Sequence, residues 1–239
     1  MSFVLLLTAS ISPYPSDDTR GRINPKDRER DYFKATKYYL SKGFKVVFVD
    51  NSNTKSDMIV ALGNEYGNLE YLHFETKRSY LGKSHGEVEI MQYAVENSVL
   101  LSKVDYLIKI TGRYLIKNIS EVLLPTNQMR EELYINPTRN LRWADSRLMM
   151  MRKSYYFNYF IPTAEKFLDE SKKVYMENAF IKSMFFFLLD GGELHLWPAY
   201  PAYDAYDGTF NEKVSFGFLK RVKYNLYYKF KKFAFKHRA

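Results

Sequence analysis

The chain has 239 residues, of which 46% are hydrophobic and 17% aromatic, and it contains no cysteine. This composition excludes a disordered protein, and the lack of cysteine excludes a disulfide framework and thiolate metal sites. The net charge is +9, but residues 220–239 hold eight cations and no Asp or Glu, so the rest of the chain is nearly neutral. We therefore expect one α/β domain over residues 1–215 and a basic tail over residues 216–239.

The first apolar run, over residues 3–9, has no Lys or Arg ahead of it and is shorter than the core of a usual signal peptide. We expect it to be a buried strand. No segment reaches the roughly 18 uninterrupted apolar residues that a membrane-spanning helix needs. We therefore expect a soluble or peripheral protein. The absence of cysteine suits a reducing compartment, so we expect this protein in the cytoplasm.

Strand-like and helix-like segments alternate in the first half of the chain, which predicts an α/β fold with a mostly parallel sheet and covering helices. The predicted order is a strand over residues 3–9, a helix over 26–43, a strand over 44–53, a helix over 56–67, a strand over 68–75, a helix over 85–102 and a strand over 104–111. The first of these helices ends at Gly43, a residue typical of helix C-termini. Gly112, Arg113 and Tyr114 then stand at the exit of the fourth strand.

The second half is less regular. We expect a short helix over 119–124, strands over 131–137 and 147–157, and one or two helices over 163–192. Residues 193–214 are predicted to form a strand followed by an aromatic, proline-rich loop. A hinge between the body and the tail is expected at residues 215–217.

Several function classes lack their usual motifs. The chain has no Walker-type glycine loop, no GxSxG sequence and no GxGxxG sequence, so kinases, serine hydrolases and dehydrogenases have no support. The four histidines, at positions 73, 85, 195 and 237, show no ligand spacing. We therefore expect no structural metal.

Four stretches together resemble bacterial glycosyltransferases that build capsule, lipopolysaccharide or lipooligosaccharide glycans. They are KVVFVDNSN at the second strand, KITGRYLIKNI at the fourth, WADSRLMMMRKSYY beyond it and YMENAF on a later helix. The resemblance implies a GT-A type, Rossmann-like fold over residues 3–210 and a nucleotide-sugar donor. Many such enzymes hold a divalent metal with an Asp-x-Asp motif after the fourth strand. This sequence has no Asp-x-Asp, and we expect no divalent metal and no other cofactor.

Open α/β sheets bind ligands outside the carboxyl ends of their strands. Combined with the resemblance, this places the donor against Ser10, Asp50, Asn51, Lys83, Lys109, Thr111, Gly112, Arg113 and Tyr114. Asp50 or Asn51 would meet the base and the ribose diol, and Lys109 and Arg113 would balance the diphosphate and the leaving group. The structural alternatives are ion pairs at Lys109 and Arg113 and an ordinary turn over DNSN.

Two other basic loops are candidates for anion contacts. Arg20 and Arg22 follow the first strand, where solvated arginines are the alternative. Residues 82–86, which include Lys83 and His85, precede a helix whose free N–H groups attract anions. A solvated helix cap is the alternative there.

Glycosyl transfer with inversion needs a base that takes the proton of the acceptor hydroxyl. The resemblance points to Glu177 of YMENAF as this base and to Asp145 of WADSR as a ligand to sugar hydroxyls. The alternatives are an acid on a helix surface and a cap at a strand end. For the acceptor we expect Trp197, Tyr203 and Asp207, because aromatic rings stack on sugars and carboxylates accept from hydroxyls; rings packed on the body are the alternative.

The tail combines apolar residues at helical spacing with many cations, a pattern typical of a basic amphipathic helix. Its expected membrane contacts are Lys220, Arg221, Lys223, Lys229, Lys231 and Lys232, arranged around Phe216, Leu219, Val222, Leu226, Phe230 and Phe233. Such a helix binds the interface of an anionic membrane. A helix packed on the core and a nucleic-acid-binding arm are the alternatives.

These expectations describe a metal-independent glycosyltransferase at the inner face of the cytoplasmic membrane. It would transfer a sugar from a nucleotide-sugar to a lipid-linked or lipid-anchored glycan, and we expect no nucleic acid as a partner. Two alternatives stay open: a nucleic-acid-binding protein with a basic C-terminal arm, and a membrane scaffold that binds nucleotide without catalysis.

Overall fold

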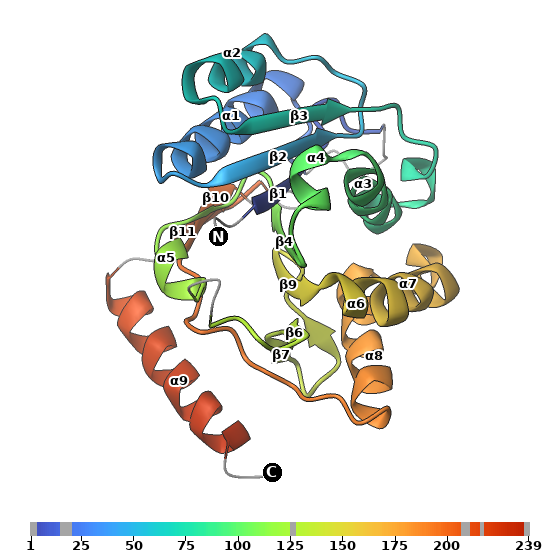
Figure 1. Cartoon of the computed structure of the whole chain (residues 1–239), viewed down its shortest axis with the longest axis vertical. Coiled ribbons are helices and arrows are strands. Elements are labelled where there is room, and N and C mark those ends of the chain that lie inside the picture. The colour runs from blue at the N-terminus through green and yellow to red at the C-terminus, as the bar shows by residue number, and fades with distance from the viewer. Residues whose placement is uncertain (1–3, 15–20, 125–127, 207–210, 216–217, 237–239) are drawn as a thin grey trace.

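The computed structural model describes residues 4–14, 21–124, 128–206, 211–215 and 218–236, and of residues 215, 218–221, 235 and 236 it describes the backbone alone (Figure 1). Its centre is a six-stranded sheet with the strand order β3-β2-β1-β4-β9-β6. The strands are β1 Val4–Ala9, β2 Lys45–Asp50, β3 Leu69–His73, β4 Tyr106–Thr111, β6 Leu133–Tyr134 and β9 Leu148–Arg152. β1, β2, β3 and β4 pair in parallel, and β9 is antiparallel to both β4 and β6. The predicted mostly parallel α/β sheet is confirmed.

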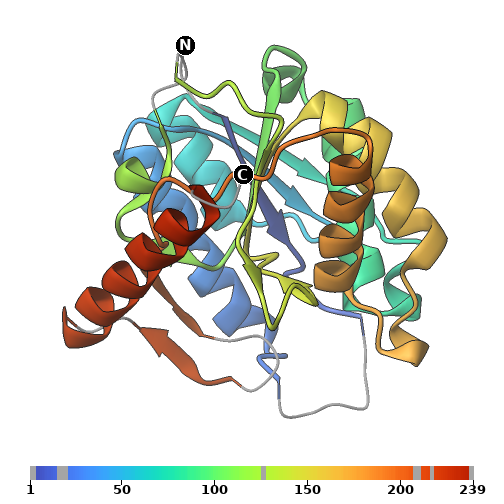
Figure 2. The same cartoon turned by 90° about the horizontal axis from the view of Figure 1, so that it is seen from below.

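Both faces of the sheet are buried, which is why β1, β2 and β4 read as continuous apolar runs. Leu5 and Leu7 of β1 point to one core, which also holds side chains of α1 Pro25–Ser41 and α2 Asp57–Tyr66. Val4 and Leu6 point to a second core with α3 Lys83–Asn97, α7 Ile161–Phe167 and α8 Met176–Leu189. Figure 2 shows the sheet between α1 on one side and α3, α7 and α8 on the other.

Local signals explain where the first helices begin and end. The Asn24 side chain accepts from the N–H groups of residues 26 and 27, and Pro25 opens α1. Gly43, at φ +82°, and Gly67, at φ +70°, follow α1 and α2 in the left-handed conformation that favours glycine. The sequence therefore predicts these two helices to within one or two residues.

The predicted helix over residues 85–102 is broken in the structure. It divides at Ser98 into α3 and the short α4 Val99–Ser102, because Ser98 is extended, with ψ 125°. The hydroxyl of Ser98 caps α4, and Glu70 of β3 accepts from the N–H groups of Val99 and Leu100 at 2.8 Å each. A contact with a distant strand thus decides the break.

The predicted strand over 147–157 is also shorter than expected. β9 ends at Arg152, and the chain continues through α6 Lys153–Tyr155 and a π-helical turn, η2 Tyr156–Phe160, into α7. Tyr155 and Phe160 are fully buried in the core shared by α3 and α8. A short apolar run is compatible with a strand or a buried helix, and packing selects the helix here.

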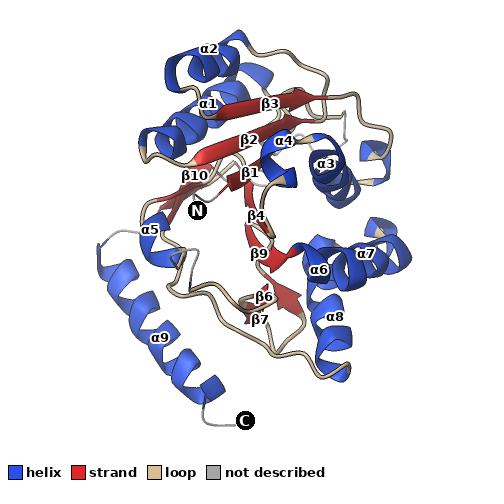
Figure 3. Ribbon diagram, in the orientation of Figure 1, coloured by secondary structure: helices blue, strands red, loops and turns tan. Residues whose placement is uncertain are grey.

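The prediction for residues 193–214 is wrong in its order. Figure 3 shows that the chain after α8 runs as a loop past β6 and β7 and only then enters a strand. The remaining strands are β5 Leu115–Ile116, β7 Pro137–Thr138, β8 Trp143–Ala144, β10 Tyr203–Tyr206 and β11 Lys213–Ser215. The small sheet β11-β10-β5 therefore contains part of the segment that was expected to be a loop. The other short helices are η1 Ser79–Leu81, α5 Ile119–Val122 and η3 Glu170–Lys172.

The tail forms α9 Phe218–Lys236, in agreement with the predicted C-terminal helix. It packs on the body through Tyr228, which is 3% exposed, and through Tyr224, whose ring stacks on Tyr200 at 5.1 Å. Among the described residues, no helix combines the length and the apolar character needed to cross a bilayer. The expected hinge includes residues 216 and 217, which lie outside the described residues.

Candidate functional site

The strand order reverses at β1, since the chain leaves it for β2 on one side and returns for β4 on the other. In open α/β sheets the crevice at such a point, beyond the carboxyl ends of the strands, is where ligands bind. Thr8 of β1 and Thr111 of β4 are paired at this edge. Gly112 follows at once, and a Cβ there would lie 2.7 Å from the carbonyl oxygen of Thr8, so the close approach requires glycine.

Lys109 forms the floor of this edge. Its side chain is completely buried, and its ammonium donates to Thr111 Oγ1 at 3.1 Å and to the Ser146 carbonyl at 2.7 Å. It also forms an ion pair with Glu87 of α3, which accepts from Thr8 Oγ1 at 3.0 Å. Lys109 therefore follows the structural alternative, and it does not present its charge to a diphosphate in this structure.

Glu177 lies above this floor in the first turn of α8. Its carboxylate accepts from Ser146 Oγ at 2.8 Å, and the residue is partly exposed. Burial raises the pKa of Glu177, the negative charge of Glu87 raises it further, and the Ser146 hydroxyl and Lys109 lower it. The structure thus brings the predicted base beside a buried cation and within reach of solvent.

Asp145 serves mainly to orient Arg147. The carboxylate accepts from Arg147 Nε at 2.9 Å and from Nη2 at 2.7 Å, and Tyr203 OH donates to it at 3.4 Å. The guanidinium of Arg147 lies 4.1 Å from the centre of the Tyr203 ring and is 32% exposed. A carboxylate that is occupied in this way has little capacity left for sugar hydroxyls, whereas Arg147 remains accessible.

Asp50 and Asn51 hold the loops that follow β1 and β2 in place through hydrogen bonds. The buried Asp50 carboxylate accepts from the N–H groups of Ile11 at 2.7 Å, Ser52 at 3.0 Å and Thr54 at 3.1 Å. Burial raises the pKa of Asp50, and these donors oppose the shift. Asn51 donates to Ser79 Oγ at 3.1 Å, while its Oδ1 is buried without a partner among the described residues. Both carboxylate oxygens of Asp50 already accept from the protein, so neither is free to accept from a ribose hydroxyl.

The remaining residues that were predicted to bind the nucleotide-sugar lie partly in the core and partly at the surface. Tyr114 is 3% exposed and packs edge-on to Tyr203, with 5.7 Å between ring centres, so it belongs to the core. Ser10 is partly exposed at the end of β1. Arg113 is partly exposed and lines a pocket of about 170 Å³ with Asp31, Lys34, Asp204 and Lys213. Its Nε is buried and has no partner in the described part of the chain.

The loop expected to take an anion at α3 already holds a carboxylate of the chain. The N–H of Ser84 donates to Glu170 of η3, and Gly82, at φ +134°, lies so close to that carboxylate that a Cβ would clash with it. Lys83 is exposed beside it. The N-terminus of α3 is therefore capped by Glu170. This resembles the alternative of a helix cap more than an anion-binding loop.

The acceptor residues are not presented as a sugar-binding surface. Trp197 is completely buried and donates through Nε1 to the Tyr134 carbonyl at 3.2 Å, and Tyr203 is also completely buried. Because neither ring has an open face, the alternative of rings packed on the body describes them. Asp207 lies outside the described residues, as does Arg20 of the predicted anion loop.

The predicted membrane cations fall on two faces of α9. Lys223 and Lys229 are exposed, whereas Lys231 donates to Asn136 Oδ1 at 2.7 Å and Lys232 to the Pro198 carbonyl at 2.6 Å. The last two therefore hold the helix to the body instead of facing outward. The side chains of Lys220 and Arg221 lie outside the described residues.

A possible cation site lies elsewhere. Glu131, Glu193 and His195 have ligand atoms within 4.8 Å of one another, at the amino end of β6 and away from the carboxyl edge. His195 Nε2 is 3.2 Å from Glu131 and 3.4 Å from Glu193, distances that also suit a simple ion pair. The expectation that no metal takes part stays a prediction. A pocket of about 340 Å³ between α7 and α8 contains no predicted site residue.

Sequence reasoning missed Glu87, Ser146, Arg147 and Arg28. Arg147 belongs to WADSR, which was singled out for Asp145, and Glu87 directly follows the loop over residues 82–86. The sequence thus indicated where both residues lie but not what they do. Arg28 lies in KDRERD, which looks like a solvated charge run. The signal that could have found it is helical spacing, since it precedes the buried Tyr32 by one turn.

No protein-family model matches the chain, and no curated protein matches it. Among solved structures, it is similar to a protein of Desulfovibrio desulfuricans G20 described as a "putative nucleotide-diphospho-sugar transferase". The two chains are 12% identical and superpose with a TM-score of 0.48, over 81% of this chain and 78% of that one. A likeness this distant carries no argument about what the present chain does.

Proposed function

We propose that the protein is a glycosyltransferase that moves a sugar from a nucleotide-sugar donor to a hydroxyl of a bacterial surface glycan. The observation that carries the proposal is the position of Glu177. It is a partly exposed carboxylate with a raised pKa at the carboxyl edge of the sheet, and Ser146 links it to the buried ammonium of Lys109. A base whose pKa is shifted towards the working pH is better suited to accept a proton than an ordinary surface acid.

In the proposed reaction the acceptor oxygen attacks the anomeric carbon of the donor sugar. The bond from that carbon to the phosphate oxygen breaks, and the nucleoside diphosphate leaves with the bonding electrons. Glu177 takes the proton that the acceptor hydroxyl loses. A single displacement of this kind inverts the anomeric configuration.

Negative charge grows on the diphosphate as the bond breaks, and fixed cations can stabilise it. We assign this role to Arg113, whose Nε lacks a partner among the described residues, and to the exposed side of Arg147. Lys109 acts from beneath, because it holds Glu87 directly and Glu177 through Ser146. The proposed chemistry requires no divalent metal.

The proposed acceptor is lipid-linked, and the support for this comes from α9. On the face turned away from the body, Val222 is 50% exposed, Leu226 56%, Phe230 67% and Phe233 64%. Lys223 and Lys229 are exposed on the same helix. An apolar stripe flanked by cations suits the interface of an anionic membrane, which would place the enzyme at the inner face of the cytoplasmic membrane.

A donor screen tests the proposal. Nucleotide-sugars carrying uracil, guanine or cytosine are incubated with the protein, and release of free nucleotide is measured with and without a lipid extract as acceptor. We expect release with at least one donor and thermal stabilisation by the matching nucleotide at millimolar concentration. Absence of both would refute the proposal, and strong retention of single-stranded nucleic acid would favour the alternative class.

A further inference from the structure

Two arginines, Arg28 of α1 and Arg113 after β4, are linked through Tyr32. Arg28 Nη2 donates to Tyr32 OH at 3.0 Å, and the Tyr32 ring packs against Gly112, the residue before Arg113. Arg28 of α1 is only 8% exposed, and Arg113 lies close enough for its positive charge to lower the pKa of Arg28, although burial has the larger effect. Among the described residues neither guanidinium forms an ion pair with a carboxylate. A buried guanidinium that has a second positive charge nearby and no counterion is costly.

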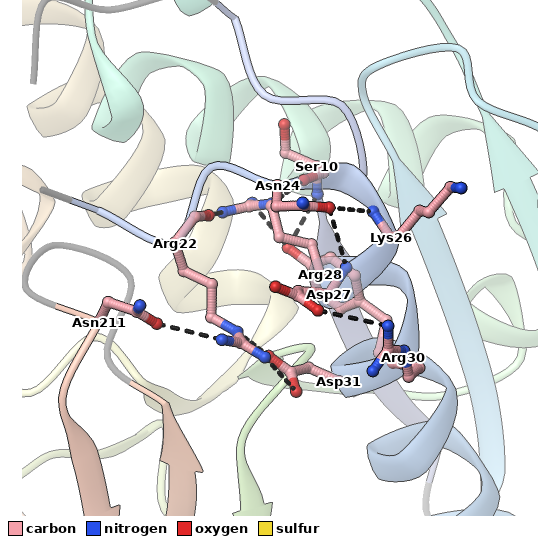
Figure 4. A network of polar contacts seen from close by, with 10 residues as sticks. Ser10, Arg22, Asn24, Lys26, Asp27, Arg28, Arg30, Asp31 and Asn211 are labelled. Atoms are coloured by element: carbon pink, nitrogen blue, oxygen red, sulfur yellow. Dashed lines mark hydrogen bonds and ion pairs between the residues drawn. The ribbon is translucent and has the colours of Figure 1, made fainter. Parts of the chain in front are cut away.

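The bonds of Arg28 are all to uncharged oxygens. Its Nε donates to the Ser10 carbonyl at 2.6 Å, Nη1 to the Arg22 carbonyl at 2.9 Å and Nη2 to Tyr32 OH at 3.0 Å (Figure 4). A guanidinium has five N–H groups, so one on each terminal nitrogen is left over. These bonds fix the orientation of the side chain but do not neutralise its charge.

The carboxylates described in this region have other partners. Asp31 accepts from Nε and Nη2 of Arg22 (Figure 4). Asp204 forms an ion pair with Lys117 at 2.9 Å. Asp50, the carboxylate whose charge raises the pKa of Arg28, already accepts from protein N–H and O–H donors. Among the residues that the structure describes, the two arginines therefore have no counterion.

Further positive charge lies on the same side. Lys34 and Lys213 are exposed and line the pocket of about 170 Å³ together with Arg113. The two acids of that pocket, Asp31 and Asp204, are the ones already paired. Among the described residues, the charges that line this pocket therefore leave a positive balance beside the end of β4.

We propose that Arg28 and Arg113 form a subsite for a multiply charged phosphate anion. Arg113 contacts the anion through the accessible part of its guanidinium, and Arg28 supplies a second positive charge held rigidly behind it. The identity of the anion as the diphosphate of a sugar donor rests on the proposed function. The subsite itself rests on the arginine pair.

The test measures thermal unfolding of the full chain in inorganic pyrophosphate, with sodium chloride at equal ionic strength as the reference. Pyrophosphate is expected to raise the unfolding temperature in a saturable way. Arg113→Gln should weaken its binding by about tenfold or more, because hydrogen bonds to charged groups are stronger than those between neutral groups. Arg30→Gln is the matched control, since Arg30 lies on the same helix with a side chain that is 70% exposed, and it should bind as the wild type does.

A second readout separates an anion site from a structural role. Without anion, Arg113→Gln removes a charge that repels Arg28, so the variant should unfold at the same or a higher temperature than the wild type. A structural arginine would lower that temperature when replaced. No stabilisation of the wild type by pyrophosphate, unchanged binding by Arg113→Gln, or a less stable variant without anion would each overturn the proposal.

Failure of the subsite and failure of the proposed sugar transfer can be told apart. Pyrophosphate binding through Arg113 without nucleotide release from any donor would uphold the subsite and refute sugar transfer. Sugar transfer at the wild-type rate and donor KM by Arg113→Gln would uphold the function and refute the subsite. Arg28→Gln adds a further test when it folds, and the Arg113 variant decides the matter when it does not.

Discussion

Lys109 and Glu87 form an ion pair in which the cation is completely buried and the carboxylate is 22% exposed. The pair joins β4 to α3 at the carboxyl edge of the sheet. Thr8 and Thr111 donate to the same carboxylate at 3.0 and 3.3 Å, so the ends of β1 and β4 are tied to one group. The pair therefore fixes the edge on which the proposed chemistry depends.

Lys109→Met is expected to lower the free energy of unfolding by about 3 kcal/mol or more, because it leaves Glu87 without its buried counterion. Urea unfolding at pH 7 measures this. The control is Lys117→Met, which breaks an ion pair whose lysine is 54% exposed and should cost less than about 1 kcal/mol. Equal losses in the two variants would show that the Lys109 pair contributes no more than a surface contact.

Glu177 gives a pH dependence of stability with a defined sign. Burial raises its pKa above the ordinary 4.5, so on raising the pH the unfolded chain loses this proton first. Between the two pKa values the folded state binds more protons than the unfolded chain. The contribution of Glu177 to the free energy of unfolding is therefore complete below the unfolded pKa, and it is lost as pH rises through the folded pKa.

Glu177→Gln has no such proton to lose, so its free energy of unfolding should rise relative to that of the wild type between pH 4.5 and pH 7. Urea unfolding at the two pH values measures the change. Glu193→Gln is the control, because the Glu193 side chain is 82% exposed. A variant whose difference from the wild type stays constant, or falls with pH, would contradict the assignment.

Lys231 predicts a second pH effect at the contact of α9 with the body. Burial lowers its pKa from 10.5 to about 8, so between these values the unfolded chain holds the extra proton and stability rises with pH. The free energy of unfolding of the wild type should therefore increase relative to that of Lys231→Met from pH 7.5 to 9.5. Lys223→Met, on the exposed face of the same helix, should follow the wild type, and parallel behaviour of all three proteins would refute the prediction.

The exposed face of α9 predicts binding to anionic membranes. The double variant Leu226→Ser and Phe230→Ser should bind phosphatidylglycerol vesicles at least about tenfold more weakly, since each apolar side chain loses burial in the interface. Vesicle sedimentation measures the binding. Phe157→Ser, at a residue that is 53% exposed on η2, is the control. Unchanged binding by the double variant, or equal binding of the wild type to neutral vesicles, would exclude the proposed contact.

The elements in the first half were predictable because their signals are local. Asn24 and Pro25 begin α1 and Gly67 ends α2 within a few residues of the side chains that pack. The break at Ser98 was not predictable, since it depends on Glu70, which lies 28 residues earlier in the chain. The same limit explains β10, whose pairing with β5 joins segments far apart in the sequence.

The site was predictable in place but not in the direction of its side chains. The end of β4 was expected to carry cations, yet Lys109 points to Glu87 and the interior. Asp50 was expected at the ribose, yet its oxygens accept from Ile11, 39 residues earlier. Trp197 shows the same limit, because composition cannot tell a ring that stacks on sugar from one that packs on the body.

The rate of nucleotide release by Glu177→Gln decides whether Glu177 acts as the base. The donor is the one that stabilises both the variant and the wild type against heat, so that binding is matched before the rates are compared. We expect a rate at least about a hundredfold below that of the wild type, since a positioned base contributes this much or more. A variant that releases nucleotide within a few-fold of the wild-type rate would contradict this role of Glu177.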